Sequence, residues 1–127
     1  MNDINKDITQ DFLSYLEKER NLSKNTISAY SRDLDLFFKF INNYDSTLMN
    51  DLTKIDRQAI RHFLGSEFDR RDERTGRHRR KITARTIARE LATIKSFFKY
   101  LVLFEEIKDN PAVHVQTPKI EKQIPNF

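Results

Sequence analysis

Glycine and proline are so scarce in this chain that they constrain its fold before any other feature does. The 127 residues include two glycines and three prolines, and no proline precedes Pro111. Sandwiches and barrels of β-strands need turn residues throughout the chain, which this sequence does not supply. Ten phenylalanines and four tyrosines provide bulky side chains for one modest core. The sequence therefore predicts an all-α fold followed by an extended C-terminal tail.

Apolar side chains recur at helical spacing in four segments. The first helix is expected at about residues 6–20, and Ser23, Asp56 and Thr83 are suitable caps for the three helices that follow. The fourth helix should end near Phe104. The longest apolar stripes are Ile27, Tyr30, Leu34, Phe37, Phe38 and Ile41 in the second helix and Ile87, Leu91, Ile94, Phe98 and Leu101 in the fourth.

Two segments lack this periodicity. Residues 70–81, with the sequence RRDERTGRHRRK, have no apolar side chain and are expected to form an exposed loop. Pro111 stops the helical pattern, although residues 112–115 could form one short further helix. We therefore expect a helical domain at 1–110 and a linker at 111–127.

The second and fourth helical segments resemble each other at an offset of 60 residues. Ser23 corresponds to Thr83 as a cap, and the Phe-Phe-Lys at 37–39 corresponds to the same tripeptide at 97–99. Either an internal duplication or the shared need for phenylalanine in two core helices explains the match. In both cases the chain offers two helices that begin with Ser or Thr and have a polar first turn.

Positive charge is concentrated in one part of the chain. Residues 57–99 contain thirteen Lys or Arg and five Asp or Glu, a net charge of +8, whereas the whole chain has a net charge of +4. The remaining residues therefore carry a net negative charge. A basic segment beside an acidic remainder is the pattern expected of a protein that binds a polyanion.

Helical phase places polar side chains opposite the apolar stripes of the second and fourth helices. Arginine suits contacts with phosphate or guanine, asparagine can pair with adenine, and the free N–H groups of a first turn attract phosphate. A polar ridge is also what any solvated helix face looks like, and the basic loop could be no more than solvated charge. The residues that we expect to contact nucleic acid are Lys24, Asn25, Thr26, Ser28, Arg32, Lys39, Arg79, Arg80, Lys81, Thr83, Arg85, Thr86, Arg89 and Ser96.

The sequence lacks the residues of a complete active site. Cysteine is absent, the common nucleotide- and metal-binding motifs do not occur, and the three histidines have no metal-ligand spacing. Asp33 and Asp35 are expected to be surface charge, and Tyr30 and Tyr100 to be structural. We expect no cofactor, no catalytic residue and no membrane segment, and the polar N-terminus favours a cytoplasmic location.

A family resemblance rests on two long stretches of the chain. One is FLSYLEKERNLSKNTISAYSRDLDLFFKFI, and the other is ITARTIARELATIKSFFKYLVLFEEIKDNPAVHVQTPK. Both are similar to the N-terminal core-binding (SAM-like) domain of tyrosine recombinases of the Xer and phage-integrase type. The resemblance covers roughly residues 8–125, and the charge of the 70–81 segment departs from many relatives.

The resemblance implies four main helices arranged as two crossed helical hairpins, which form half of a clamp on DNA. It implies that the second helix, with Thr26 and Arg32, and the fourth, with Thr86 and Arg89, approach the major groove. A separate C-terminal domain, which this chain lacks, would carry the catalytic residues of the parent recombinase. The implied partner is a double-stranded DNA recombination site, on which the parent would assemble as a tetramer; we expect the isolated domain to be monomeric.

Two other classes of function were weighed against DNA binding. A helical protein-interaction module would use the same polar ridge to meet an acidic partner, and it would expose an apolar patch on one helix. A stand-alone enzyme would need a catalytic constellation that the sequence does not show.

Overall fold

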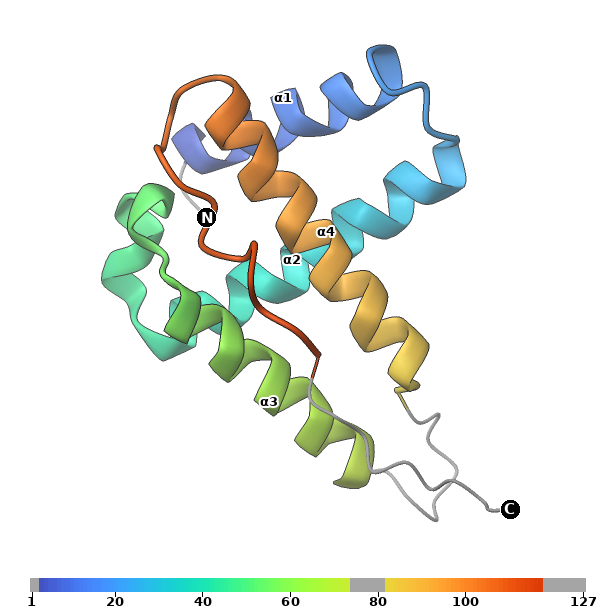
Figure 1. Cartoon of the computed structure of the whole chain (residues 1–127), viewed down its shortest axis with the longest axis vertical. Coiled ribbons are helices and arrows are strands. Elements are labelled where there is room, and N and C mark those ends of the chain that lie inside the picture. The colour runs from blue at the N-terminus through green and yellow to red at the C-terminus, as the bar shows by residue number, and fades with distance from the viewer. Residues whose placement is uncertain (1–2, 74–81, 118–127) are drawn as a thin grey trace.

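The chain folds into four main helices, of which α2 and α4 cross near the centre of the molecule (Figure 1). The computed structural model describes residues 3–73 and 82–117, and all regular elements in these ranges are helical. The predicted all-α fold with four main helices is confirmed. In chain order the elements are α1 (Asp3–Lys18), α2 (Lys24–Tyr44), the short 3-10 helices η1 (Ser46–Asn50) and η2 (Leu52–Lys54), α3 (Arg57–Glu73) and α4 (Ala84–Leu103).

Helix α3 is longer than the sequence pattern predicts. It extends to Glu73, so residues 70–73 are helical, although the expected loop began at residue 70. Arg and Glu have good intrinsic helix propensity, which favours one more helical turn at these residues. The remainder of the predicted loop, residues 74–81, lies outside the described residues.

Left-handed backbone conformations reverse the chain after α1 and after α4. Asn21 has a φ of 54°, which suits asparagine better than most residues, and Glu105 has a φ of 61°. After α4, the N–H of Glu105 donates to the carbonyl of Val102 at 3.0 Å, and the N–H of Glu106 donates to that of Leu101 at 2.8 Å. This pair of hydrogen bonds is a Schellman motif, which satisfies carbonyl groups that the end of the helix would leave unpaired.

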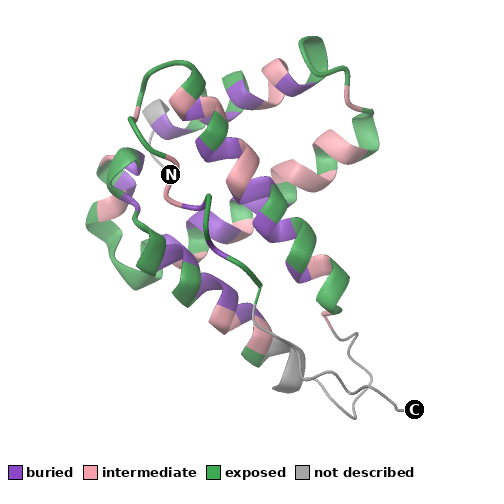
Figure 2. Cartoon of the chain, in the orientation of Figure 1, coloured by how far each residue is buried: buried purple, intermediate pink, exposed green. Residues whose placement is uncertain are grey.

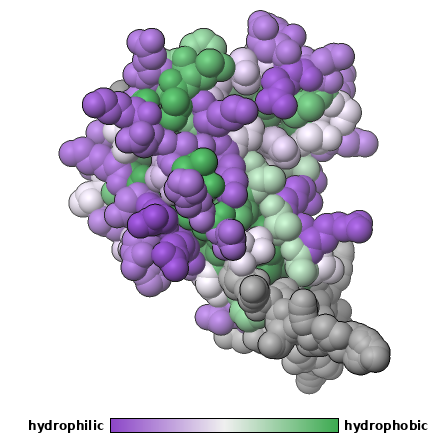
Figure 3. Space-filling view, viewed as in Figure 1, coloured by the Kyte–Doolittle hydropathy of each residue, from purple (hydrophilic) through white to green (hydrophobic). Residues whose placement is uncertain are grey.

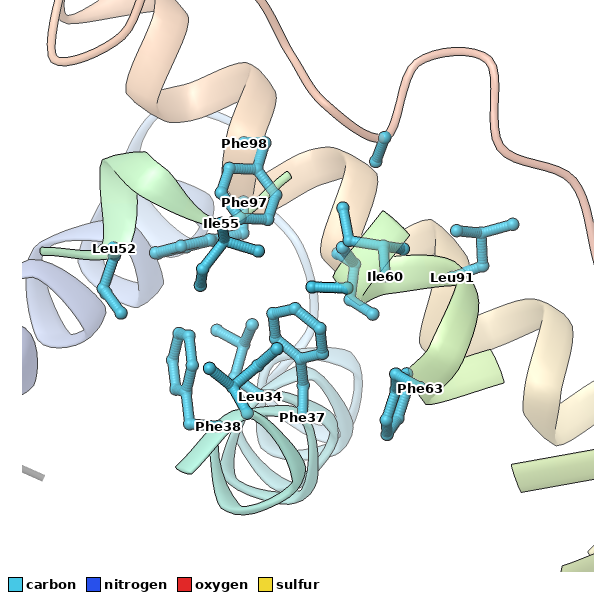
Figure 4. Packing of buried hydrophobic residues seen from close by; sticks show 14 of the residues in the cluster. Leu34, Phe37, Phe38, Leu52, Ile55, Ile60, Phe63, Leu91, Phe97 and Phe98 are labelled. Carbon is cyan, nitrogen blue, oxygen red and sulfur yellow. The ribbon is translucent and has the colours of Figure 1, made fainter. Parts of the chain in front are cut away.

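Buried positions lie along all four main helices (Figure 2), and phenylalanines of α2, α3 and α4 meet in the core (Figure 4), which Phe12 of α1 completes. Phe97 of α4 contacts Phe12 of α1 and Phe38 of α2 edge to face, at centroid distances of 5.4 and 5.6 Å. Phe37 contacts Phe63 of α3 in the same way at 5.2 Å. Edge-to-face pairs add about 0.5–1.5 kcal/mol each to the gain from burial, so these contacts fix the helices relative to one another.

The segment after α4 is part of the folded body. The side chain of Asn110 donates to the carbonyl of Lys95 at 3.2 Å and accepts from the N–H of Ala112 at 2.8 Å. Ala112 and Val115 are both buried in the core, and residues 111–114 form a turn where a short helix at 112–115 was expected. The packed body therefore continues past residue 110, where the sequence pattern led us to expect the domain to end, because two apolar side chains beyond Pro111 reach the core.

Candidate nucleic-acid interface

The first turns of α2 and α4 have the same hydrogen-bonded structure. Ser23 caps α2 by accepting from the N–H of Thr26 at 3.1 Å, and Thr83 caps α4 by accepting from the N–H of Thr86 at 3.1 Å. In each turn the hydroxyl of the cap also donates to the hydroxyl of the threonine, at 3.0 Å in α2 and 3.1 Å in α4. Both predicted caps are confirmed, and the offset of 60 residues holds at atomic detail.

Both first turns keep the electrostatic properties that favour an anion. Neither contains an acidic residue, so no carboxylate offsets the positive end of the helix dipole. Each cap satisfies one of the four N–H groups that lack a partner within the helix. The N–H groups that remain can donate to a phosphate, and the dipole favours its negative charge.

The two first turns lie on one side of the point where the helices cross (Figure 1). The crossing is marked by a hydrogen bond from the hydroxyl of Thr93 to the carboxylate of Asp33. Each of these residues is ten positions from the cap of its helix, which is about 15 Å at 1.5 Å per residue. The first turns of α2 and α4 therefore lie at equal distances, measured along their helices, from the Asp33–Thr93 contact.

The outer face of α4 carries the predicted basic ridge. Arg85 and Arg89 are exposed, and so are the small residues Ala88 and Ala92 beside them, whereas Thr86 is half-buried. The opposite face is buried, as the apolar stripe predicts. Small exposed side chains leave room for another molecule to approach the helix closely.

The outer face of α2 carries a second set of polar side chains. Lys24, Asn25, Ser28 and Arg32 are exposed, and Thr26 is half-buried. The guanidinium of Arg32 donates to the hydroxyl of Ser28 at 3.1 Å, so the two side chains lie together one turn apart. The N-terminal half of α2 therefore exposes the polar side chains that the helical phase placed opposite its apolar stripe.

Two predicted residues lie far from the first turns. Lys39 is exposed beside a groove that it lines with Asn42 and Thr47, and it is about 20 Å along α2 from Thr26. Ser96 is half-buried near the other end of α4 from the first turn. The structure does not bring either residue to the first turns. Three further predicted residues, Arg79, Arg80 and Lys81, lie outside the residues whose side chains are described.

Asp33 is buried, and its prediction as surface charge is wrong. It has 3% of its side chain exposed and accepts two hydrogen bonds from Arg89, from Nε at 2.9 Å and from an Nη at 2.6 Å. The hydroxyl of Thr93 donates to the same carboxylate at 2.8 Å. The hydrogen bond to Asp33 raises the pKa of Arg89 above its ordinary value. Arg89 is thus both part of the exposed ridge and joined to the buried centre of the crossing.

The spacing of the apolar stripe in α2 indicates that Asp33 faces the core. Asp33 is three residues after Tyr30 and four before Phe37, so it occupies a core-facing position of α2. Thr93 occupies the corresponding position of α4, four residues before Phe97. A charged residue at a core-facing position requires a partner, and an arginine and a hydroxyl on the facing helix supply it.

The tyrosines that face the core have structural roles. Tyr100 packs against Tyr15 and Phe104, at centroid distances of 5.2 and 4.9 Å. Burial, followed by the nearby carboxylates of Asp11 and Glu106, raises the pKa of Tyr100, which is the opposite of what an activated nucleophile needs. Tyr30 is likewise packed against the core.

Metal-binding clusters and membrane-spanning helices are absent from the described part of the chain. It holds no group of three or more His, Asp or Glu side chains placed to bind a metal ion. Within the same residues, no helix has the length and apolar character needed to cross a membrane. His62 is exposed and lies against the ring of Tyr44 at 5.3 Å.

The fold and the paired helices define the class to which this chain belongs. The family model of the phage integrase, N-terminal SAM-like domain matches residues 9–103. The chain is a member of this family.

Relatives that the chain matches over most of its length are named as tyrosine recombinases. The chain is 34% identical over 122 residues to tyrosine recombinase XerC of Chlorobaculum tepidum, an alignment of 92% of this chain and 33% of the relative. It is 34% identical over 118 residues to tyrosine recombinase XerD of Oceanobacillus iheyensis, covering 93% of this chain and 36% of the relative. The chain thus spans about a third of the length of these curated relatives. No solved structure matches it.

Proposed function

We propose that this helical domain binds double-stranded DNA and positions a site-specific tyrosine recombinase on a recombination half-site. The first turns of α2 and α4 and the exposed ridges that follow them form the contact surface. The exposed arginines of that surface are Arg32, Arg85 and Arg89. Arg79, Arg80 and Lys81 would add phosphate contacts beside it.

One observation carries this proposal: two helices that cross at the centre of the fold begin with the same capped, acid-free first turn. One helix N-terminus binds one anion, whereas duplex DNA presents phosphates at regular spacing along its backbone. Two such turns fixed about 15 Å from one crossing point suit a ligand with repeated phosphates. The net charge of +8 over residues 57–99 favours the same ligand.

The proposal extends to the parent protein. The named relatives are about three times as long as the matched region, so the parent would carry a catalytic domain that is not in this sequence. The helical domain would be joined to it through the segment that follows Val115, the last residue that the structure places in the core. The parent would assemble as a tetramer on two DNA sites and act in the cytoplasm, and the isolated helical domain would be monomeric.

The proposal can be tested with the 127-residue chain and a fluorescently labelled duplex. Anisotropy titrations at low and high salt should show binding that weakens as salt rises, because bound cationic groups displace counterions from DNA. An unlabelled duplex should compete much more strongly than polyglutamate at equal total charge. Equal competition by polyglutamate, or absence of duplex binding at low salt, would show that the surface serves another ligand.

A second candidate function is an interaction with an acidic protein, and one observation favours it. Figure 3 shows hydrophilic side chains with hydrophobic ones between them on one face of the molecule. Leu103 and Phe104, at the end of α4, are each more than half exposed. Adjacent apolar side chains at a surface often contact a partner. They lie at the opposite end of α4 from its first turn, so an acidic protein would contact this apolar end in addition to the polar ridge, whereas DNA would contact the ridge alone.

A further inference from the structure

The guanidinium of Arg89 is held in one orientation by a buried group. Its Nε and one Nη donate to the two separate oxygens of Asp33, a side-on bidentate pair that fixes the guanidinium plane. Asp33 is in turn fixed by the hydroxyl of Thr93 and by its own burial. Arg89 therefore differs from an ordinary surface arginine, whose long side chain samples many rotamers.

The ion pair with Asp33 does not use the N–H donors at the outer edge of the Arg89 guanidinium. A guanidinium has five N–H donors, and the pair with Asp33 uses two of them. The three others include one on each terminal nitrogen, side by side, which is the edge that donates to O6 and N7 of guanine. The Arg89 side chain as a whole is 42% exposed, so it lies where an outside ligand can contact it.

Arg89 and its neighbour Arg85 differ in the charges that surround them. The carboxylate of Asp33 offsets the positive charge of Arg89, which weakens its attraction for a phosphate. Arg85 lies in the first turn of α4, where the helix dipole adds to its charge, and it forms no ion pair with the residues whose side chains are described. The two arginines are thus suited to different parts of a DNA duplex.

We infer that Asp33 is a positioning residue that holds Arg89 to read a base edge, most suitably that of guanine, while Arg85 contacts phosphate. This inference rests on the proposed DNA binding and adds to it a division of roles within one helix. Thr93 contributes by fixing the carboxylate from its buried side. The inference makes Asp33 a determinant of sequence preference although it does not touch DNA.

The test is a selection of preferred sequences from a pool of randomised duplexes, followed by salt titrations on the preferred duplex. The wild-type chain should favour guanine at one or more positions by on the order of tenfold. Asp33→Asn and Arg89→Lys should each abolish the preference at one and the same position. The slope of log affinity against log salt should change little in Arg89→Lys, which keeps the charge.

Arg85→Ala is the contrasting variant. It should weaken binding to all sequences, lower the salt slope by about one and leave the guanine preference in place. Asp33→Asn removes a negative charge. If Asp33 acted through its charge alone, this variant should bind DNA as tightly as wild type or more tightly, and it should keep the guanine preference. Loss of preference without loss of non-specific affinity therefore separates positioning from charge.

Phe98→Leu controls for a loosened helix crossing, since it removes the ring contact of Phe98 with Phe37 but keeps the pair of Asp33 with Arg89. It should lower the free energy of unfolding and retain the guanine preference. A guanine preference that survives in Arg89→Lys, or a wild-type chain that binds DNA with no preference, would overturn the inference and leave DNA binding itself intact. A wild-type chain that does not bind duplex DNA would instead refute the proposed function.

Discussion

The carboxylate of Asp33 accepts a hydrogen bond from the hydroxyl of Thr93 at 2.8 Å, and the two residues are 60 positions apart in the chain. That separation equals the offset at which the sequence of α2 resembles that of α4. Equivalent residues of the two helices therefore meet each other at the crossing. In a two-fold arrangement, only residues on the axis contact their own equivalents.

The phenylalanines beside this contact follow the same relationship. Phe37 lies 6.4 Å from Phe98, and Phe38 lies 5.6 Å from Phe97, both edge to face. Each pair is the reciprocal of the other under the 60-residue offset, as two-fold symmetry requires. The resemblance between the two helices is thus also a resemblance in how they pack, which supports an internal duplication.

Removing either cap should destabilise the fold by a similar amount. Ser23→Ala and Thr83→Ala each remove the acceptor for one first-turn N–H, which should lower the free energy of unfolding by about 1 kcal/mol. Urea denaturation measures this change. Ser23→Thr and Thr83→Ser keep the acceptor and should retain most of the stability. Loss of stability in these conservative variants equal to that in the alanine variants would rule out capping as the cause.

Glycine at position 105 should stabilise the chain. Glu105 adopts a φ of 61° at the end of α4, where a side chain is strained and glycine is not. Glu105→Gly should raise the free energy of unfolding by about 0.5–1 kcal/mol after the entropy cost of glycine in the unfolded chain. Glu106→Gly removes the same charge from a residue without positive φ, so it should not stabilise. Equal effects of the two variants on the midpoint of denaturation would show that Glu105 is not strained by its positive φ.

Stability should fall in acid partly through Asp51. Thr53, through its side chain and then its backbone N–H, holds the pKa of Asp51 below its ordinary value of 3.8. A carboxylate with a lowered pKa stabilises the fold fully above its ordinary pKa, and this contribution is lost as the pH falls through the lowered value. Asp51→Asn should therefore show a smaller drop in melting temperature below about pH 4 than wild type. A parallel pH profile for the two proteins would exclude this role.

The two outer surfaces of the fold should respond differently to loss of an arginine. Arg85→Ala on α4 should weaken duplex binding and lower the salt slope by about one, because one phosphate contact is removed. Arg61→Ala is the matched control, since Arg61 is exposed on α3 beside Phe40 and Tyr44, away from the proposed interface. It should leave the salt slope within error of wild type. Equal losses in the two variants would mean that only total charge matters.

Caps and periodicity predicted the helices well because both depend on residues close together in the chain. Ser23 and Thr83 begin their helices as expected, and the apolar stripes of α2 and α4 are buried. The end of α3 was not predicted, since residues 70–73 lack an apolar side chain and their sequence is compatible with either helix or loop. The burial of Ala112 depends on a chain reversal that local pattern does not specify.

The candidate site was predicted as a set of exposed side chains but not as an arrangement. Helical phase placed Arg85 and Arg89 on the outer face of α4, where the structure has them. It did not reveal that Arg89 is paired with a residue on another helix, because a contact over 56 positions follows from tertiary packing alone. Asp33 was misassigned for the same reason, although its register within the apolar stripe indicated a core-facing position.

The most direct test of DNA binding by α2 and α4 is to map the contact surface residue by residue. Amide proton–nitrogen correlation spectra of the labelled chain should be recorded as duplex DNA is added. The largest shifts should fall in the first turns of α2 and α4 and at Arg32, Arg85 and Arg89. Shifts centred instead on Leu103 and Phe104, with the first turns unchanged, would contradict the account.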